Sequence, residues 1–581
     1  MATWAPPPGS TWPTSNRLIR VFAGASLRQD DGRCAYKKAL KVRTGLRLPP
    51  GPLPAYKADK RESFPLGPTG RALDLIEHGG TEPEEALRLA LAAADDRPKA
   101  DPGLAAWTRF AVRRYLEGRP SELTPLGCSW VVVTSLERPD ARGAKRYEQC
   151  VWGRPYISAD GRVRELCLPV TRPLDDLPGP TDPDAIDTAV RADLAAAAQV
   201  VSQGDPYRLP AYRQWSKDAV PALDVGEAAW RRPEEVRITE VSCLDGRRRE
   251  LVREDPEEIA RRYTAYGAPG LTAAVSGDGF LPGHDCEDCK YVPDCPALSR
   301  LGGVLSIRDS TKPRRIFSVT NGRAYQGRPG HDEVCPARER LRRLRLPDPD
   351  GRALTPHVIR GHAVHAWIQQ RHESHPGTAC LPEDAPDGGA PWSAGRWTVP
   401  EEQAELGARM IAAHARHCPY RLSSVREVVH ERTVVVHDTA ADVLVLAKTD
   451  MLYRDGVSWV YRETKTDARR HPPADAHIFR ERPQLALAVL LSTSTAVNDD
   501  ASATRVELET LGPTGATLTI IDPFDPENRA AARLVVHALA AEWHADAEAS
   551  ARPGLHCRNC EMAVWCRPGP ADDPVPAATK G

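Results

Sequence analysis

Two cysteine triplets with identical spacing constrain this chain more than any other feature of its sequence. Cys286, Cys289 and Cys295 lie in CEDCKYVPDC, and a second triplet, Cys557, Cys560 and Cys566, lies in CRNCEMAVWC. Both read C-x2-C-x5-C, and chance does not readily give the same triplet twice in a chain with 14 cysteines. Spacing of this kind is typical of metal or cluster ligation.

A fourth cysteine stands upstream of each triplet, as a tetrahedral metal or a cubane cluster requires. Cys34 and Cys335 each open a basic stretch that soon reaches the same four residues, Leu-Arg-Leu-Pro. We therefore interpret the chain as two copies of one plan, at 15–300 and 335–568, each with its ends tied by four thiolates. Spacing alone leaves both zinc and a [4Fe–4S] cluster open.

The remaining segments and cysteines have simpler interpretations. We predict a disordered N-terminus at 1–14, a basic linker at 301–334 and a disordered tail at 569–581. The other cysteines are interpreted as ordinary buried thiols, namely Cys128, Cys150, Cys167, Cys243, Cys380 and Cys418.

Charge and hydropathy exclude several classes of protein. A formal net charge of -1, from 78 basic and 79 acidic residues, excludes a histone-like polycation and an acidic tail protein. No apolar run approaches the length of a membrane span, and the start lacks a signal-peptide pattern. We expect a cytoplasmic protein, in which clustered cysteines favour metal over disulfides.

A β-hairpin is predicted within residues 443–466. An apolar strand, VLVLA, is followed by Asp450, a turn signal at Asp455-Gly456, and a second strand from Ser458 to Lys465. Because side chains alternate along a strand, Glu463 and Lys465 share a face, and the hairpin can bring Asp450 near Glu463.

Two carboxylates and a lysine on one face suit metal-dependent hydrolysis. The carboxylates can hold Mg²⁺ or Mn²⁺ against a phosphodiester, and the lysine can orient the attacking water. D-x12-E-x-K alone is weak, because charged residues make up 27% of the chain. Its context adds His365, a metal-ligand candidate on a predicted helix, and Gln484, at the start of an apolar helix after Arg482-Pro483.

In this order, His365, Asp450, Glu463-x-Lys465, Gln484 and the closing cysteines resemble the RecB-type branch of the PD-(D/E)xK nucleases. Members of that branch carry a four-cysteine iron–sulfur cluster and include AddB-like and CRISPR-associated exonucleases. The resemblance implies an α/β fold with a mixed central sheet flanked by helices, here as two tandem restriction-endonuclease-like domains. It also implies dependence on Mg²⁺ or Mn²⁺ and cleavage of DNA, commonly from single-stranded ends.

Carried over residue by residue, the resemblance implies specific roles. His365, Asp450 and Glu463 match metal ligands, Lys465 the catalytic lysine, and Gln484 the following helix motif. The cysteines that match the cluster ligands are Cys335, Cys557, Cys560 and Cys566, and a possible second cluster would use Cys34, Cys286, Cys289 and Cys295. Two departures concern Ala488, where the family often has Tyr, and Ala447, where it usually has Gly.

The first copy is predicted to be catalytically silent. Aligning Asp160-Gly161 with Asp455-Gly456 places Leu168 and Val170 where Glu463 and Lys465 stand, and Pro155 where Asp450 stands. Asp74 takes the place of His365.

Nucleic-acid contact is expected beside Cys335. Residues 301–345 carry 11 basic and four acidic residues, and Arg338, Arg342 and Arg345 could meet phosphates. No Walker A motif occurs, so a separate helicase or other subunit would supply unwinding. By family analogy the pathway is DNA repair or antiviral defence. The alternatives are a non-catalytic nucleic-acid-binding scaffold with structural zinc or iron–sulfur sites, and an RNA substrate.

Overall fold

The computed structural model divides the chain into two compact units. The first unit comprises Met1–Cys295, Arg340–Asp350 and Asn559–Gly581, and the second comprises Pro296–Glu339 and Gly351–Arg558. The structure describes residues 4–12, 17–23, 33–49, 61–92, 99–140, 142–174, 188–211, 214–326, 334–349, 354–468, 478–494 and 504–566.

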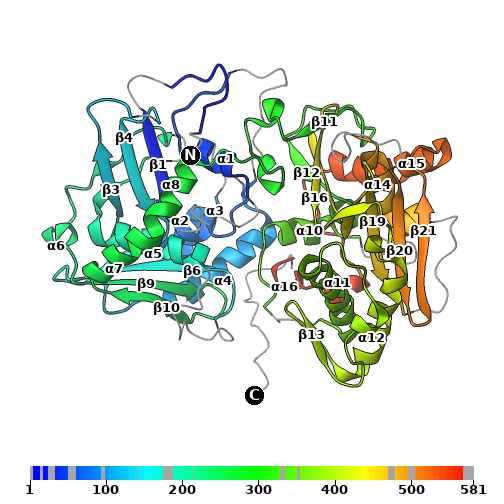
Figure 1. The fold of residues 1–581 in the computed structure, drawn as a ribbon. Helices are drawn as coiled ribbons and strands as arrows, with labels where there is room; N and C mark the ends of the chain where they lie inside the picture. The colour runs from blue at the N-terminus through cyan, green and yellow to red at the C-terminus, as the bar shows by residue number, and fades with distance from the viewer. Residues whose placement is uncertain are drawn as a thin grey trace. The chain divides into compact units, whose positions relative to one another are not determined.

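The second unit has mixed sheets, and helices alternate with groups of strands along its chain (Figure 1). One sheet has the order β11-β16-β17-β12, a larger one the order β15-β18-β19-β20-β21, and β13 pairs with β14 alone. The strands are β11 (Ser299–Leu301), β12 (Arg315–Phe317), β13 (Trp392–Ala394), β14 (Trp397–Val399), β15 (Val425–His430), β16 (Thr433–Asp438), β17 (Val443–Lys448), β18 (Met451–Asp455), β19 (Ser458–Thr466), β20 (Val506–Gly512) and β21 (Gly515–Ile521). The helices are α9 (Val319–Gln326), α11 (Pro356–Ser374), α12 (Glu401–His414), α13 (Ile478–Glu481), α14 (Pro483–Ser492) and α15 (Pro526–Ala545), with short 3-10 turns η7 (Pro382–Asp384), η8 (Ala415–His417) and η9 (Pro419–Arg421).

The predicted turn and second strand are confirmed: β19 pairs antiparallel with β18 up to Asp455 opposite Ser458. The predicted first strand, VLVLA, is wrong as a member of this hairpin, because it forms β17 in the four-stranded sheet and the chain bends at Thr449 and Asp450 before β18 begins. Gly456 makes the turn with φ +63°, a left-handed conformation that glycine adopts without strain. β19 also pairs with β20 in parallel, so it lies inside the sheet with a neighbour on each side. The predicted helix after Arg482 is α14, with Pro483 at its first position.

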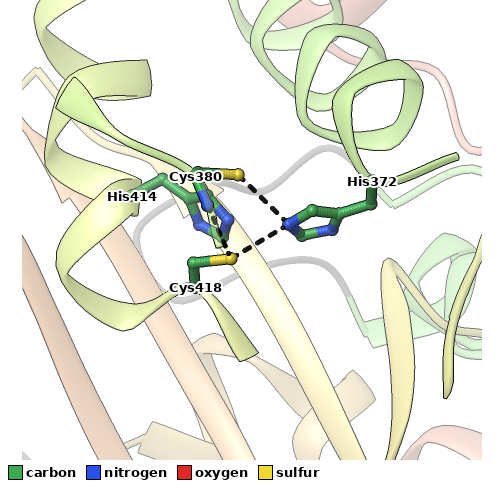
Figure 2. Close-up of side chains that lie close together, drawn as sticks. All are labelled: His372, Cys380, His414 and Cys418. Carbon is green, nitrogen blue, oxygen red and sulfur yellow. Dashed lines mark hydrogen bonds between the residues drawn. The ribbon is translucent and has the colours of Figure 1, made fainter. Parts of the chain in front are cut away.

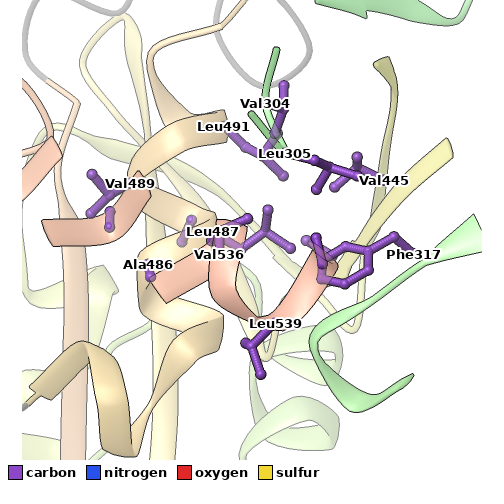
Figure 3. Packing of buried hydrophobic residues seen from close by; sticks show 14 of the residues in the cluster. Val304, Leu305, Phe317, Val445, Ala486, Leu487, Val489, Leu491, Val536 and Leu539 are labelled. Carbon is purple, nitrogen blue, oxygen red and sulfur yellow. The ribbon is translucent and has the colours of Figure 1, made fainter. Parts of the chain in front are cut away.

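Helices cover both faces of the larger sheet. On one face, α14 and α15 pack in an apolar core that includes Phe317, Val445 and Leu487 (Figure 3). On the other face, α11 and α12 join β18 and β19 in a second cluster. Burial of these apolar faces is the main stabilisation of such a layered unit.

The first unit connects its strands in a closely similar way. The sheet order β10-β9-β6-β5-β2 repeats the scheme β21-β20-β19-β18-β15, with an antiparallel hairpin, a parallel pair and a second antiparallel pair. A second sheet has the order β1-β4-β3-β7-β8. The strands are β1 (Leu18–Ala23), β2 (Thr124–Pro125), β3 (Ser129–Ser135), β4 (Arg146–Val151), β5 (Arg154–Ile157), β6 (Val163–Val170), β7 (Asp205–Arg208), β8 (Val220–Pro221), β9 (Glu235–Ser242) and β10 (Arg248–Glu254).

The helices of the first unit include α5, which lies in the connection from β6 to β9 together with β7, β8 and α6, as α14 lies with α13 in the connection from β19 to β20. The others precede, join or follow these strands, and are α1 (Ala35–Lys41), α2 (Gly67–Glu77), α3 (Pro83–Leu91), α4 (Pro102–Gly118), α5 (Thr188–Gln203), α6 (Glu227–Trp230), α7 (Pro256–Arg262), the π-helical η4 (Tyr263–Gly267), α8 (Ala268–Ser276), η5 (His284–Cys286), η6 (Val292–Asp294) and α16 (Ala563–Cys566). Two helices, α10 (Pro336–Arg343) and the 3-10 helix η11 (Leu555–Asn559), cross the division between the units.

Several segments differ from the simple picture drawn from the sequence. The segment 301–334, predicted as a linker, supplies β12 and α9 to the second unit. Residues 4–12 have defined positions, with Trp4 buried beside Tyr36, and the rest of 1–14 lies outside the described residues. The predicted tail 569–581 lies outside the described residues. Among the helices that the structure describes, none has the length and apolarity that crossing a membrane requires.

Candidate functional site

The hairpin β18–β19 brings together the acidic and basic residues that the sequence singled out. The Lys465 ammonium contacts the Glu463 carboxylate and lies 3.3 Å from Asp450 Oδ2. The backbone N–H of Thr464 donates to the same Asp450 oxygen at 2.9 Å. One ammonium and one backbone amide therefore fix Asp450 at the end of β17, where the chain turns into β18.

Helices supply the two other predicted members. His365 on α11 has its Nδ1 3.8 Å from Asp450 Oδ1. The Gln484 side-chain amide, in the first turn of α14, donates to Glu463 Oε1 at 3.2 Å. The five predicted residues His365, Asp450, Glu463, Lys465 and Gln484 thus lie in one connected group.

Sequence reasoning missed Glu431, which joins this group. His365, Glu431 and Asp450 offer ligand atoms within 4.8 Å of one another. Glu431 follows β15 with φ +53°, a strained backbone conformation for a residue other than glycine. Its only sequence signal is an acidic residue directly after a strand, which many solvated loops share.

Burial perturbs the ionisation of this group. Burial and the charge of Asp450 raise the pKa of Glu463 above the usual glutamate range, although the Lys465 ammonium opposes them. Burial lowers the pKa of His365, which keeps its imidazole neutral and able to act as a ligand at pH 7. Burial tends to lower the pKa of Lys465, but Glu463 and Asp450 raise it further, so the ammonium stays charged.

The donor set suits a hard divalent cation. Glu463 is only 4% exposed, and its Oε2 is buried without a hydrogen-bond partner. An unsatisfied buried carboxylate oxygen is costly unless a cation compensates it. Carboxylates and a neutral imidazole around it fit Mg²⁺ or Mn²⁺.

The first predicted cysteine set is gathered in space. Cys34, Cys286, Cys289 and Cys295 line one pocket of the first unit, beside Tyr36 and Tyr291. Backbone N–H groups of Lys37 and Gly283 lie 3.5 Å from the sulfurs of Cys34 and Cys286. Amides directed at sulfur are favourable for thiolates that hold a metal or a cluster.

The second cysteine set and the basic residues are divided between the units. Cys335 and Cys557 belong to the second unit, and Cys560 and Cys566 to the first. Arg338 likewise belongs to the second unit, whereas Arg342 and Arg345 are exposed in the first. Arg342 pairs with Glu561. That the four cysteines bind one cluster together, and that the three arginines contact the phosphates of one nucleic acid together, stays a prediction.

Two cysteines that the sequence left as plain buried thiols have histidine neighbours. Cys380 and Cys418 are buried, as expected, but they form a group with His372 and His414 in which all four offer ligand atoms within 4.8 Å of one another. The available signals were H-x7-C at 372–380 and H-x3-C at 414–418, neither of which is specific alone.

Comparison with known proteins agrees with the class that this fold and site define. Residues 333–567 match the family model described as the PD-(D/E)XK nuclease superfamily. This segment is therefore similar to nucleases of that superfamily, and the similarity supports a nuclease-type hydrolase activity.

No curated protein matches the chain. A solved structure titled "Crystal structure of SSO0001" is similar at 13% identity, covering 35% of this chain and 93% of its own, with a TM-score of 0.17.

Proposed function

We propose that the second unit is a Mg²⁺- or Mn²⁺-dependent deoxyribonuclease of the RecB type. The observation that carries the proposal is the Lys465 ammonium between Asp450 and Glu463, next to a buried Glu463 oxygen without a partner. A lysine beside two metal-binding carboxylates is the arrangement that phosphodiester hydrolysis needs.

Each residue then has a definite task. His365, Asp450 and Glu463 hold the metal, and Glu431 is an additional ligand candidate. When bound, the metal polarises the phosphodiester and lowers the pKa of its water. Lys465 orients the attacking water and stabilises the charge that develops on the phosphate oxygens.

Two further groups position the carboxylates. Gln484 holds the Glu463 carboxylate through Oε1, which leaves Oε2 for the metal. The Thr464 N–H holds Asp450. Both contacts restrict the carboxylates to a few orientations, which lowers the entropy lost on metal binding.

DNA with single-stranded ends is the substrate we favour, because the site order resembles RecB-type exonucleases. Arg338, Arg342 and Arg345 are candidate phosphate contacts. A separate helicase or other defence or repair subunit would supply the substrate, and the pathway is DNA repair or antiviral defence.

The two cysteine sets are proposed to bind [4Fe–4S] clusters, with zinc as the alternative. Support comes from the repeated C-x2-C-x5-C spacing and, for Cys34 and its triplet, from their common pocket. Anaerobically purified protein should be brown, whereas a colourless protein with zinc in both sets would refute the iron–sulfur assignment.

The first unit is proposed to be a degenerate copy of the same domain. Its sheet repeats the strand connections of the nuclease unit. Arg154 stands opposite Cys167, just as Met451 stands opposite Arg462, and with these pairs equated we propose Gly153, rather than Pro155, as the counterpart of Asp450. Arg154 instead pairs with Asp74 and Glu77 on α2.

Cleavage assays on end-labelled single- and double-stranded DNA and on RNA, with Mg²⁺, Mn²⁺ or EDTA, test the proposal. We expect metal-dependent cleavage of DNA that Glu463→Ala and Lys465→Ala abolish. Glu427→Ala, which changes an exposed glutamate on β15, is the matched control and should cut normally. Cleavage retained in both site variants would refute the assignment, and DNA binding without cleavage would favour a scaffold.

A further inference from the structure

Four buried side chains of the second unit converge outside the proposed nuclease site. They are His372 at the end of α11, Cys380 in the following segment, His414 at the end of α12, and Cys418 just beyond it (Figure 2). Their ligand atoms all lie within 4.8 Å of one another.

The spacing of these atoms fits a tetrahedral metal site. His372 Nε2 lies 3.3 Å from the sulfur of Cys380 and 3.3 Å from that of Cys418. Zinc–nitrogen and zinc–sulfur bonds of about 2.0 and 2.3 Å imply nitrogen–sulfur edges of about 3.5 Å in a tetrahedron. The ligand atoms therefore need only small adjustments to surround one ion.

The outer nitrogen of each imidazole has a partner that directs the inner nitrogen toward the sulfurs. His414 Nδ1 lies 2.9 and 3.0 Å from the two oxygens of the Glu509 carboxylate. His372 Nδ1 lies 2.9 Å from His430 Nε2. A histidine that donates from one ring nitrogen to such a partner presents the other as a metal ligand.

One atom of the group has no partner of its own. His414 Nε2 is buried and without a hydrogen bond, although its other nitrogen is satisfied. A buried, unpartnered nitrogen directed at a thiol pair is unfavourable without an ion and is satisfied by one.

We propose that His372, Cys380, His414 and Cys418 bind one structural Zn²⁺ ion. Two thiolates and two imidazoles in a closed, buried tetrahedron are a ligand set typical of zinc. The side chains of all four are at most 2% exposed, so no open coordination position faces solvent and the ion has no catalytic role.

The proposed zinc site is connected to both α11 and β19, the two elements that carry His365 and the Glu463–Lys465 pair. That these elements form a nuclease site rests on the proposed function. His372 and His365 are on α11, about two helical turns apart. Glu509 on β20 stands opposite Thr464, whose hydroxyl donates to it at 3.4 Å, and Thr464 lies between Glu463 and Lys465. The four zinc ligands are thus positioning residues that fix α11 relative to β19.

Metal analysis of the intact chain tests the site. Wild-type protein should contain zinc, and X-ray absorption should resolve a population with two sulfur and two nitrogen ligands. Cys418→Ser should lose one zinc equivalent per chain. Cys243→Ser, which changes a buried thiol of the first unit, is the matched control and should lose none.

Wild-type protein decides the question if Cys418→Ser fails to fold. Absence of zinc, a zinc spectrum with four sulfurs only, or a Cys380–Cys418 disulfide in peptide mass spectrometry would overturn the proposal. So would an unchanged zinc content in a folded Cys418→Ser.

The two proposals fail separately. Protein that holds this zinc but cuts no DNA would refute only the nuclease function, and protein that cuts DNA without it would refute only the zinc site. Hydrogen exchange supplies a readout independent of activity, because zinc removal should increase exchange in α12 and at the end of α11.

Discussion

Replacing Lys465 by methionine should destabilise the structure around β17–β19 when no metal is bound. Mg²⁺ should restore part of this stability. Lys465 Nζ lies 3.3 Å from Asp450 Oδ2 and contacts Glu463 as well. At an effective dielectric constant of about 20, a pair at that distance of 3.3 Å interacts with about 5 kcal/mol. The side chain of Lys465 is 28% exposed, and its desolvation offsets much of this energy, so we expect a net loss of about 1–3 kcal/mol.

Hydrogen exchange of peptides covering β17–β19, measured in EDTA and in Mg²⁺, is the suitable assay because it reports local opening. In EDTA the opening free energy of Lys465→Met should fall by that amount. Mg²⁺ should stabilise the variant more than the wild type, because the cation replaces the missing positive charge. At 100 times the dissociation constant, binding supplies about 2.7 kcal/mol.

A matched lysine provides the control in EDTA. Lys448 is 64% exposed and pairs with Glu431, so Lys448→Met should cost less than about 1 kcal/mol. If Lys465→Met were as stable as Lys448→Met without metal, the ammonium would not compensate the two carboxylates, and the reasoning would be wrong.

Three further changes test the packing, the buried charge and the metal site. Leu487→Ala, at a fully buried position of α14, should cost about 2–5 kcal/mol of unfolding free energy, measured from the transition of the second unit when the intact chain is unfolded in urea. A loss under about 1 kcal/mol would contradict the burial of Leu487 in the core. Asp442→Asn removes the carboxylate 2.8 Å from Arg314 Nε and should cost about 3–5 kcal/mol by the same assay, because a buried ion pair loses its negative member; an unchanged midpoint would contradict this. Because the pKa of Glu463 is raised, protons compete with metal at that carboxylate near neutrality, so Mg²⁺ affinity should increase as pH rises from 6 to 8.5 in calorimetric titrations, and a pH-independent affinity would exclude such competition.

Local signals made the turn and the second strand of the β18–β19 hairpin predictable, but not its first strand, because the apolar run VLVLA pairs in the other sheet. Asp455-Gly456 specified the turn, and strict alternation placed Glu463 and Lys465 on one face, because both depend only on neighbouring residues. His365 was located through its helix and the resemblance together.

The parts that sequence reasoning missed depend on distant residues. Glu431 reaches the site through a left-handed backbone at the end of β15, which no composition or periodicity announces. Cys380 and Cys418 each have a histidine partner, but no short motif links His372 to Cys418. Their proximity follows from the packing of α11 against α12, which is tertiary information.

The backbone at Gly153 limits which side chains the first unit can accept at that position. It has φ +145°, and a Cβ there would lie 2.8 Å from the Cys167 carbonyl oxygen. An aspartate at this position is therefore excluded unless the backbone itself moves. Under the proposed correspondence with Asp450, replacing Gly153 alone by aspartate would therefore not restore a metal ligand without a shift of the backbone. Under the proposed function, in which the second unit carries the chemistry, selection on the first unit acts on binding and stability.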